Sequence, residues 1–224
     1  MKQKIMIATP THNGSIDVLT YMSVFAAVDA LQKRGIEVAI RTKVATLVDR
    51  ARNLFASVTL NDHSVTHLLF VDADMGFPAT AVLRMLEFDK PVLGVLYPTR
   101  GTPSRFVCAE TIVPGRKPRD GFIRTLHVGT GLMLIKRHVL EEMRDHYGDL
   151  YFADGDPSYR QEGLEGPLLE VFSQMRDRHG RMMGEDTSFC QRWVDMGARC
   201  LRLPTRRFPM SVGACGKAAT ATSR

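Results

Sequence analysis

Two carboxylates stand at the end of an apolar run, where charged side chains are costly unless they have a partner. The run His67–Val71 (HLLFV) is followed directly by Asp72, Ala73 and Asp74. A divalent cation removes the cost of such buried charges, because one or two carboxylates and phosphate oxygens together form Mg²⁺ and Mn²⁺ sites. The pattern predicts a metal–diphosphate site with Asp72 and Asp74 as ligands. The alternative is that these acids cap the helix expected to begin at Pro78.

A second acidic pair, Glu185 and Asp186, follows Gly184 at the expected start of the last helix. A carboxylate at this position can act as a general base that removes a proton from an incoming hydroxyl group. The alternative is an ordinary helix start, because acids in the first turn satisfy free backbone N–H groups and the helix dipole. The pair by itself leaves both interpretations open.

Two further segments have residues suited to a nucleotide. Residues 8–14 (ATPTHNG) follow the first expected strand, and their small and hydroxyl side chains allow a nucleotide to approach the backbone. A plain turn is the alternative, since Pro and Asn-Gly form turns in any case. Arg52, beside Arg50 and Asn53, has a planar guanidinium group that can pair with a diphosphate, although a single arginine more often faces solvent. The chain has neither GxxxxGK nor GxGxxG, which argues against a P-loop or dinucleotide-binding fold.

Short apolar runs alternate with helical periodicity, which is the pattern of a mostly parallel sheet flanked by helices. The expected strands are Lys4–Ala8, Ile36–Arg41, His67–Val71, Pro91–Leu96 and Leu132–Ile135. Residues 98–126 are rich in Pro, Gly and Arg, and we expect an irregular excursion there with strand-like runs at Phe106–Ala109 and Phe122–Leu126. Residues 149–170 read as an acidic loop.

The expected helices are defined by their apolar spacing and by their ends. The first has the spaced set Leu19, Met22, Ala26, Ala27 and Ala30, and the last runs over Thr187–Met196 with Phe189, Trp193 and Met196 inward. Thr46 and Asp49 resemble a capping box at the start of the second helix. Its expected buried stripe is Leu47, Ala51, Leu54, Phe55 and Val58.

Length and charge favour one α/β domain over residues 1–203 and a basic, flexible tail over residues 204–224. The formal net charge is +6. Six basic residues and no acid follow Asp195, so the preceding part is balanced, which argues against nucleic acid as a partner. The chain has no apolar run long enough for a transmembrane segment, and its four cysteines form no CxxC pair. We therefore expect a cytoplasmic protein.

The order of these motifs resembles the GT-A glycosyltransferases, and especially the family 2-like members. The similarity spans roughly residues 4–198 and includes TPTHN, ATLVDRARN, LLFVDADMGF, VGTGLMLIKR and MGEDTSFCQRW, of which the DAD and GED elements are the most specific. It implies the GT-A fold, a nucleotide-diphosphate sugar as donor, and Mn²⁺ or Mg²⁺ as cofactor. The acceptor would be a carbohydrate, a lipid-linked molecule or a protein. Whether the protein forms a homo-oligomer is left open by the sequence.

The resemblance also implies a role for each site residue. Asp74 would be the direct metal ligand, and Asp72 would face the ribose and the metal. Asp186 would be the catalytic base of an inverting reaction, supported by Glu185. The nucleotide sugar would lie against Thr9, Pro10, Thr11, Arg52, Asp72 and Ala73.

One departure from the family concerns the metal site. Many relatives have a histidine after the last helix that completes the metal shell, whereas residues 201–224 contain no histidine. This departure favours, as one alternative, a catalytically weak nucleotide-sugar-binding protein. The other alternative is a nucleotidyltransferase of related fold, but the turn at 9–14 lacks the Lys or Arg expected of it.

Overall fold

A seven-stranded mixed sheet forms the centre of the protein, in the order β2-β1-β3-β7-β5-β10-β6. The computed structural model describes residues 2–97, 123–203 and 211–212. Strands β1, β2, β3, β5 and β10 run in one direction, while β7 and β6 are antiparallel to their neighbours. The strands of this sheet are β1 (Lys4–Thr11), β2 (Glu37–Val44), β3 (His67–Val71), β5 (Val92–Val95), β6 (Ile123–Thr125), β7 (Leu132–Lys136) and β10 (Cys200–Leu203).

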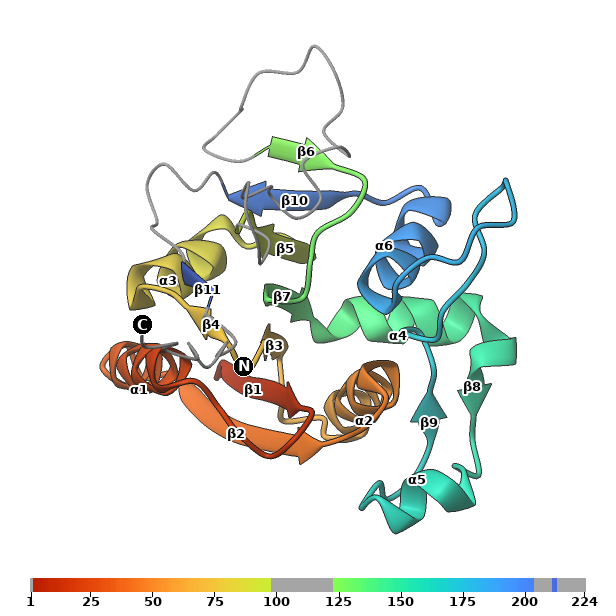
Figure 1. Ribbon diagram of the computed structural model, residues 1–224, viewed down its shortest axis with the longest axis horizontal. Coiled ribbons are helices and arrows are strands. Elements are labelled where there is room, and N and C mark those ends of the chain that lie inside the picture. The colour runs from red at the N-terminus through yellow and green to blue at the C-terminus, as the bar shows by residue number, and fades with distance from the viewer. Residues whose placement is uncertain (1, 98–122, 204–210, 213–224) are drawn as a thin grey trace, which may run out of the picture.

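Helices cover both faces of the sheet, so the domain has three layers (Figure 1). One face packs against α1 and α3, and the other against α2, α4 and α6. The alternation within β3 explains this, since Leu68 and Phe70 point to one face and Leu69 and Val71 to the other. The helices are α1 (Val18–Gln32), α2 (Val48–Asn61), α3 (Ala79–Phe88), α4 (Arg137–His146), α5 (Pro157–Gln161) and α6 (Glu185–Asp195).

Two small two-stranded sheets lie outside the central one. Strand β4 (Met75–Gly76) pairs with β11 (Ser211–Val212), and β8 (Tyr151–Phe152) pairs with β9 (Leu168–Leu169). A 3₁₀ turn, η2 (Gly148–Leu150), precedes β8. The segment 149–170, expected as a loop, therefore contains two short strands and α5. Strand β11 belongs to the expected tail, and its pairing holds that part of the chain next to β4.

The fold class expected from the sequence is confirmed, and several boundaries shift. Strands β1 and β2 extend further than expected, β5 is shorter, and α6 begins at Glu185. The capping box is wrong, because α2 begins after Leu47 and has no side-chain cap. Leu47 is also exposed rather than buried. The expected strand-like run Phe106–Ala109 lies outside the described residues.

The first helix differs most from its expected packing. Leu19 and Met22 are half-exposed, and the residues that α1 buries against the sheet include Ala27 and Leu31. None of the helices in the described part of the chain has the length and apolar character that a membrane crossing requires. The apolar residues of α1 therefore lie on two sides of the helix, of which one faces solvent.

Candidate active site

A cavity of about 570 Å³ lies at the carboxyl ends of β1 and β3 and beside the start of α2. Parallel pairing brings these ends together, since Ala8 of β1 is in register with Phe70 of β3. Its volume lies in the range of small-molecule sites. The residues that line it come from the end of β1, three loops and α2: Pro10, Thr11, His12, Asn13, Ser15, Ile16, Asp17, Ala45, Thr46, Val48, Arg52, Asp72, Ala73 and Asp74.

Backbone hydrogen bonds hold the Asp72–Asp74 loop in place. The N–H of Asp72 donates to the carbonyl of Gly131 at 3.1 Å, and the N–H of Asp17 donates to the carbonyl of Ala73 at 2.7 Å. The N–H of Met75 donates to the carbonyl of Asp72 at 3.2 Å. Pro78 precedes α3 without a side-chain cap, so the capping alternative for the two acids is wrong. The loop instead presents Asp72 and Asp74 to the cavity.

Arg52 connects the two acidic motifs through a buried guanidinium group. Its side chain is only 4% exposed, and Nη2 donates to Oδ1 of Asp72 at 3.1 Å. Nε forms an ion pair with Oε1 of Glu185 at 3.2 Å. The guanidinium also lies 5.5 Å from the centre of the Phe70 ring. Burial and these partners show that the solvent-facing alternative for Arg52 is wrong.

The charged groups of this cluster shift one another's pKa values. Burial disfavours the charged form of Arg52, but Asp72, Glu185 and Asp186 outweigh it and raise the pKa of the guanidinium. Burial also raises the pKa of the Glu185 carboxyl group, and Arg52 opposes that rise. Removing Arg52 would thus leave Glu185 as a poorly hydrated carboxylate beside other acids.

Nη1 of Arg52 is buried and has no hydrogen-bond partner among the described residues. Because Arg52 lines the cavity, this N–H group is a donor beside a space where a ligand can bind. A buried donor without a partner is costly, and an anionic oxygen is the acceptor that suits a guanidinium best. The arrangement therefore fits a phosphate or carboxylate group of a ligand.

Glu185 and Asp186 begin α6 but do not line the cavity. Gly184 is the N-cap of this helix and provides no side-chain cap. Oδ1 of Asp186 accepts hydrogen bonds from the backbone N–H of Thr187 at 2.6 Å and from Oγ1 of Thr187 at 3.2 Å. Glu185 is thus connected to the cavity by its ion pair with Arg52. Asp186 lies close enough to affect the pKa of Arg52.

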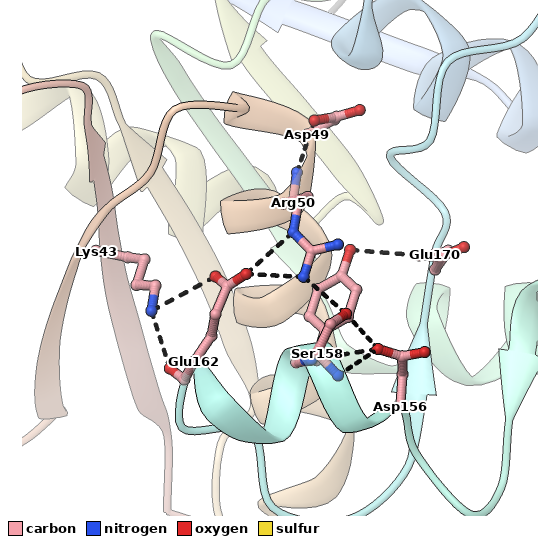
Figure 2. Close-up of polar contacts among 8 residues, drawn as sticks. Lys43, Asp49, Arg50, Asp156, Ser158, Glu162 and Glu170 are labelled. Atoms are coloured by element: carbon pink, nitrogen blue, oxygen red, sulfur yellow. Dashed lines mark hydrogen bonds and ion pairs between the residues drawn. The ribbon is translucent and has the colours of Figure 1, made fainter.

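Arg50, two residues before Arg52, has a different role. Its Nε and Nη2 donate to Oε1 of Glu162 at 3.0 and 2.7 Å, and Nη2 also donates to Oγ of Ser158 (Figure 2). Its guanidinium lies 4.2 Å from the centre of the Tyr159 ring. Lys43 donates to the backbone carbonyl of Glu162 at 3.0 Å. Arg50 therefore fastens α5 to α2, while Arg52 joins the acidic motifs.

Tyr97 is a residue of this region that the sequence analysis missed. It is buried, and its hydroxyl oxygen accepts a hydrogen bond from the N–H of Gly131 at 3.0 Å. Burial and, next, the charge of Asp72 raise its pKa. A Cβ atom on Gly131 would lie 2.5 Å from the Tyr97 ring, so this approach requires glycine. The GTG motif in the sequence was the available signal for a close contact.

The structure brings most of the expected binding residues into one cavity. Pro10, Thr11, Arg52, Ala73 and the two aspartates line it, whereas Thr9 is buried in β1 and does not. Six further lining residues were not expected from the sequence, and they lie in the β1–α1 and β2–α2 loops and at the start of α2. They carry no distinctive motif: Ser15, Ile16, Asp17, Ala45, Thr46 and Val48.

The donor set suits a hard divalent cation, although the described residues contain no preformed cluster of ligands. The described residues hold no group of three or more His, Cys, Asp or Glu side chains arranged for a metal. Mg²⁺ is commonly held by one or two carboxylates together with phosphate oxygens and water, so such a cluster is not required. Asp72 and Asp74 fit this pattern. The histidine that lines the cavity is His12.

Comparison with known proteins places the chain by its fold. No protein-family model matches the sequence, and no curated protein matches it either. The structure is similar to A197 from STIV, with 16% identity, a TM-score of 0.51, and coverage of 95% of this chain and 85% of that one.

Two further structures are similar at lower scores. One is mannose-1-phosphate geranyltransferase from Thermus thermophilus, with 11% identity, a TM-score of 0.49, and coverage of 93% of this chain and 76% of that one. The other is GalNAc-T7, solved with UDP, GalNAc and Mn²⁺, with 13% identity, a TM-score of 0.46, and coverage of 99% of this chain and 45% of that one. The likeness to A197 is one of fold alone, and the fold of this chain is GT-A-like.

Proposed function

We propose that the protein transfers a sugar from a nucleotide-diphosphate sugar to an acceptor hydroxyl group. The observation that supports this most is the Arg52 cluster, in which one buried cation joins Asp72 to Glu185 and keeps a donor without a partner beside the cavity. A diphosphate supplies the anionic oxygens that this donor needs. The carboxylates beside it suit the cation that normally accompanies a diphosphate.

Several residues of the cavity have a proposed role in donor binding. Asp74 and Asp72 would hold Mn²⁺ or Mg²⁺, which neutralises charge on the departing diphosphate. Arg52 keeps Asp72 oriented and contacts a phosphate oxygen through Nη1. Pro10 and Thr11 border the nucleoside from the end of β1. Ala45 and Thr46 of the β2–α2 loop border the same cavity beside Thr11.

Asp186 is the proposed general base. The acceptor oxygen attacks the anomeric carbon, the bond from that carbon to the diphosphate oxygen breaks, and Asp186 takes the acceptor proton. Attack from the face opposite the leaving group gives inversion. Oδ1 of Asp186 already accepts a hydrogen bond from the N–H of Thr187. The acceptor hydroxyl must therefore replace that hydrogen bond or approach the second carboxylate oxygen, Oδ2.

The position of Asp186 supports a second candidate, a nucleotide-sugar-binding protein with weak turnover. Asp186 does not line the cavity, and its Oδ1 is satisfied by Thr187. Binding of the donor would then persist without chemistry. Release of nucleoside diphosphate from a nucleotide sugar, measured with and without acceptors, separates the two candidates.

Calorimetric titration with nucleoside diphosphates tests the site. We expect the wild type to bind one of them more tightly with Mn²⁺ than with chelator, and we expect Asp74→Ala to lose that enhancement. Asp195→Ala, which removes an exposed acid from the end of α6, is the matched control and should bind like the wild type. Equal affinity with metal, with chelator and in Asp74→Ala would show that the metal assignment is wrong.

A further inference from the structure

The first helix exposes an apolar surface, which we call the α1 face: Val18, Leu19, Tyr21, Met22 and Phe25. These side chains are between 50% and 69% exposed. Most of them recur at helical spacing on the side opposite Ala27 and Leu31, which α1 buries against the sheet. Helices that are apolar on all sides are normally buried on all sides. The face therefore has the composition of a contact surface.

The size of the α1 face suits a protein partner. With two aromatic rings among five large side chains, it exposes roughly 500 Å² of apolar surface, near the upper limit for a monomer. A stable interface buries about 800 Å² on each partner. The apolar part of the face by itself provides more than half of that area.

The charges of α1 favour a protein over a lipid surface. Helices that bind bilayers carry Lys and Arg beside their apolar side chains. Helix α1 contains no Lys or Arg, and its one charged residue is Asp29. Asp17 lies directly before the helix and Lys33 directly after it. The two ends thus have opposite charges.

We propose that the α1 face binds a second copy of this chain, with the two helices antiparallel and crossing at Phe25. Tyr21, Phe25 and Asp29 lie on one ridge at i, i+4 and i+8, and such ridges interdigitate in the commonest class of helix packing. A two-fold axis at Phe25 places the Tyr21 hydroxyl of each copy beside the Asp29 carboxylate of the other. It also brings the acidic start of each helix toward the basic end of the other, which a parallel arrangement would not do.

Sedimentation velocity of the full chain from roughly 1 to 100 µM tests the proposal. We expect a dimer of the 25.0 kDa chain in the wild type and a dissociation constant at least about a hundredfold higher in Phe25→Glu, since both copies lose the central residue. Because Phe25 is 64% exposed, the melting temperature of a monomeric Phe25→Glu should show intact folding. Ile40→Glu, at an apolar residue of the edge strand β2 that is 53% exposed, is the matched control and should still dimerise.

Cross-linking checks the geometry. Ala26→Cys, in a background without Cys108 and Cys215, should form covalent dimers with a short bismaleimide, whereas Met182→Cys should not. A wild type that stays monomeric at about 100 µM overturns the proposal. So does a dimer that Ile40→Glu disrupts and Phe25→Glu does not. Co-sedimentation of the wild type, but not of Phe25→Glu, with phosphatidylcholine vesicles would show that the face binds lipid and would also overturn it.

Discussion

Replacing Arg52 by Met removes the cation that joins Asp72 to Glu185 while keeping most of the side-chain volume. Removing one partner of a buried ion pair costs about 3 to 5 kcal/mol, since the other charge stays buried. Here Asp72 is 29% exposed and Glu185 is 16% exposed, so water compensates part of the loss. We take the lower value, about 3 kcal/mol of unfolding free energy. For a domain of this size, the melting temperature should fall by roughly 6 to 12 °C.

The stability lost in Arg52→Met should become smaller at lower pH. Burial already raises the pKa of Glu185 above the ordinary value of 4.5, and Arg52 opposes that rise, so Arg52→Met raises the pKa further. A folded-state pKa above the unfolded value means that the folded protein binds the proton more tightly. The deficit of Arg52→Met relative to the wild type should therefore narrow as the pH falls from about 7.5 toward 5.

Three further variants make the measurement specific. The double variant Arg52→Met/Glu185→Gln should regain part of the lost stability, because the isolated carboxylate is gone. Arg50→Met is the matched control on the same helix. Arg50 and its partner Glu162 are 31% and 26% exposed, so we expect a loss of only about 1 kcal/mol. Thermal melts of the wild type, Arg52→Met, these two variants and the third, Glu185→Gln, measure the effect. The reasoning is refuted if Arg52→Met is no less stable than Arg50→Met. It is also refuted if the double variant loses as much stability as Arg52→Met and Glu185→Gln lose together.

Three further predictions concern two residues at or near the site and the C-terminal segment. Tyr97→Phe leaves the buried N–H of Gly131 without its acceptor, so urea titration should show a loss of about 1 to 3 kcal/mol; an unchanged midpoint would contradict the contact. Asp186→Asn should reduce turnover roughly a hundredfold or more with donor affinity nearly unchanged, and a folded variant with normal turnover would leave Asp186 as a helix-start residue only. A chain that ends at Leu203 should keep its melting temperature within about 2 °C, because β11 is the one paired element in the described part of residues 204–224; a larger fall would show that this region stabilises the domain.

The sequence alone determined the elements that depend on local pattern. His67–Val71 is a strand with the expected bounds, because an apolar run buried on both faces has no other stable position in an α/β sheet. The carboxyl end of that strand then had to face the ligand side of the sheet. The position of Asp72 and Asp74 beside Pro10 and Thr11 follows from the same rule.

Only the tertiary structure decided which side chains meet across the chain. The sequence predicts Arg52 as a phosphate-binding residue but not its ion pair with Glu185 of α6, and Tyr97 has no recognisable role until Gly131 packs on its ring. Residue spacing gives a helix its apolar positions but not the side that the sheet covers, which is why the exposure of Phe25 was not foreseen. Local periodicity fixes which residues share an element. Partners separated by dozens of residues are chosen by the packing of whole layers, and that choice has no counterpart in a short window of sequence.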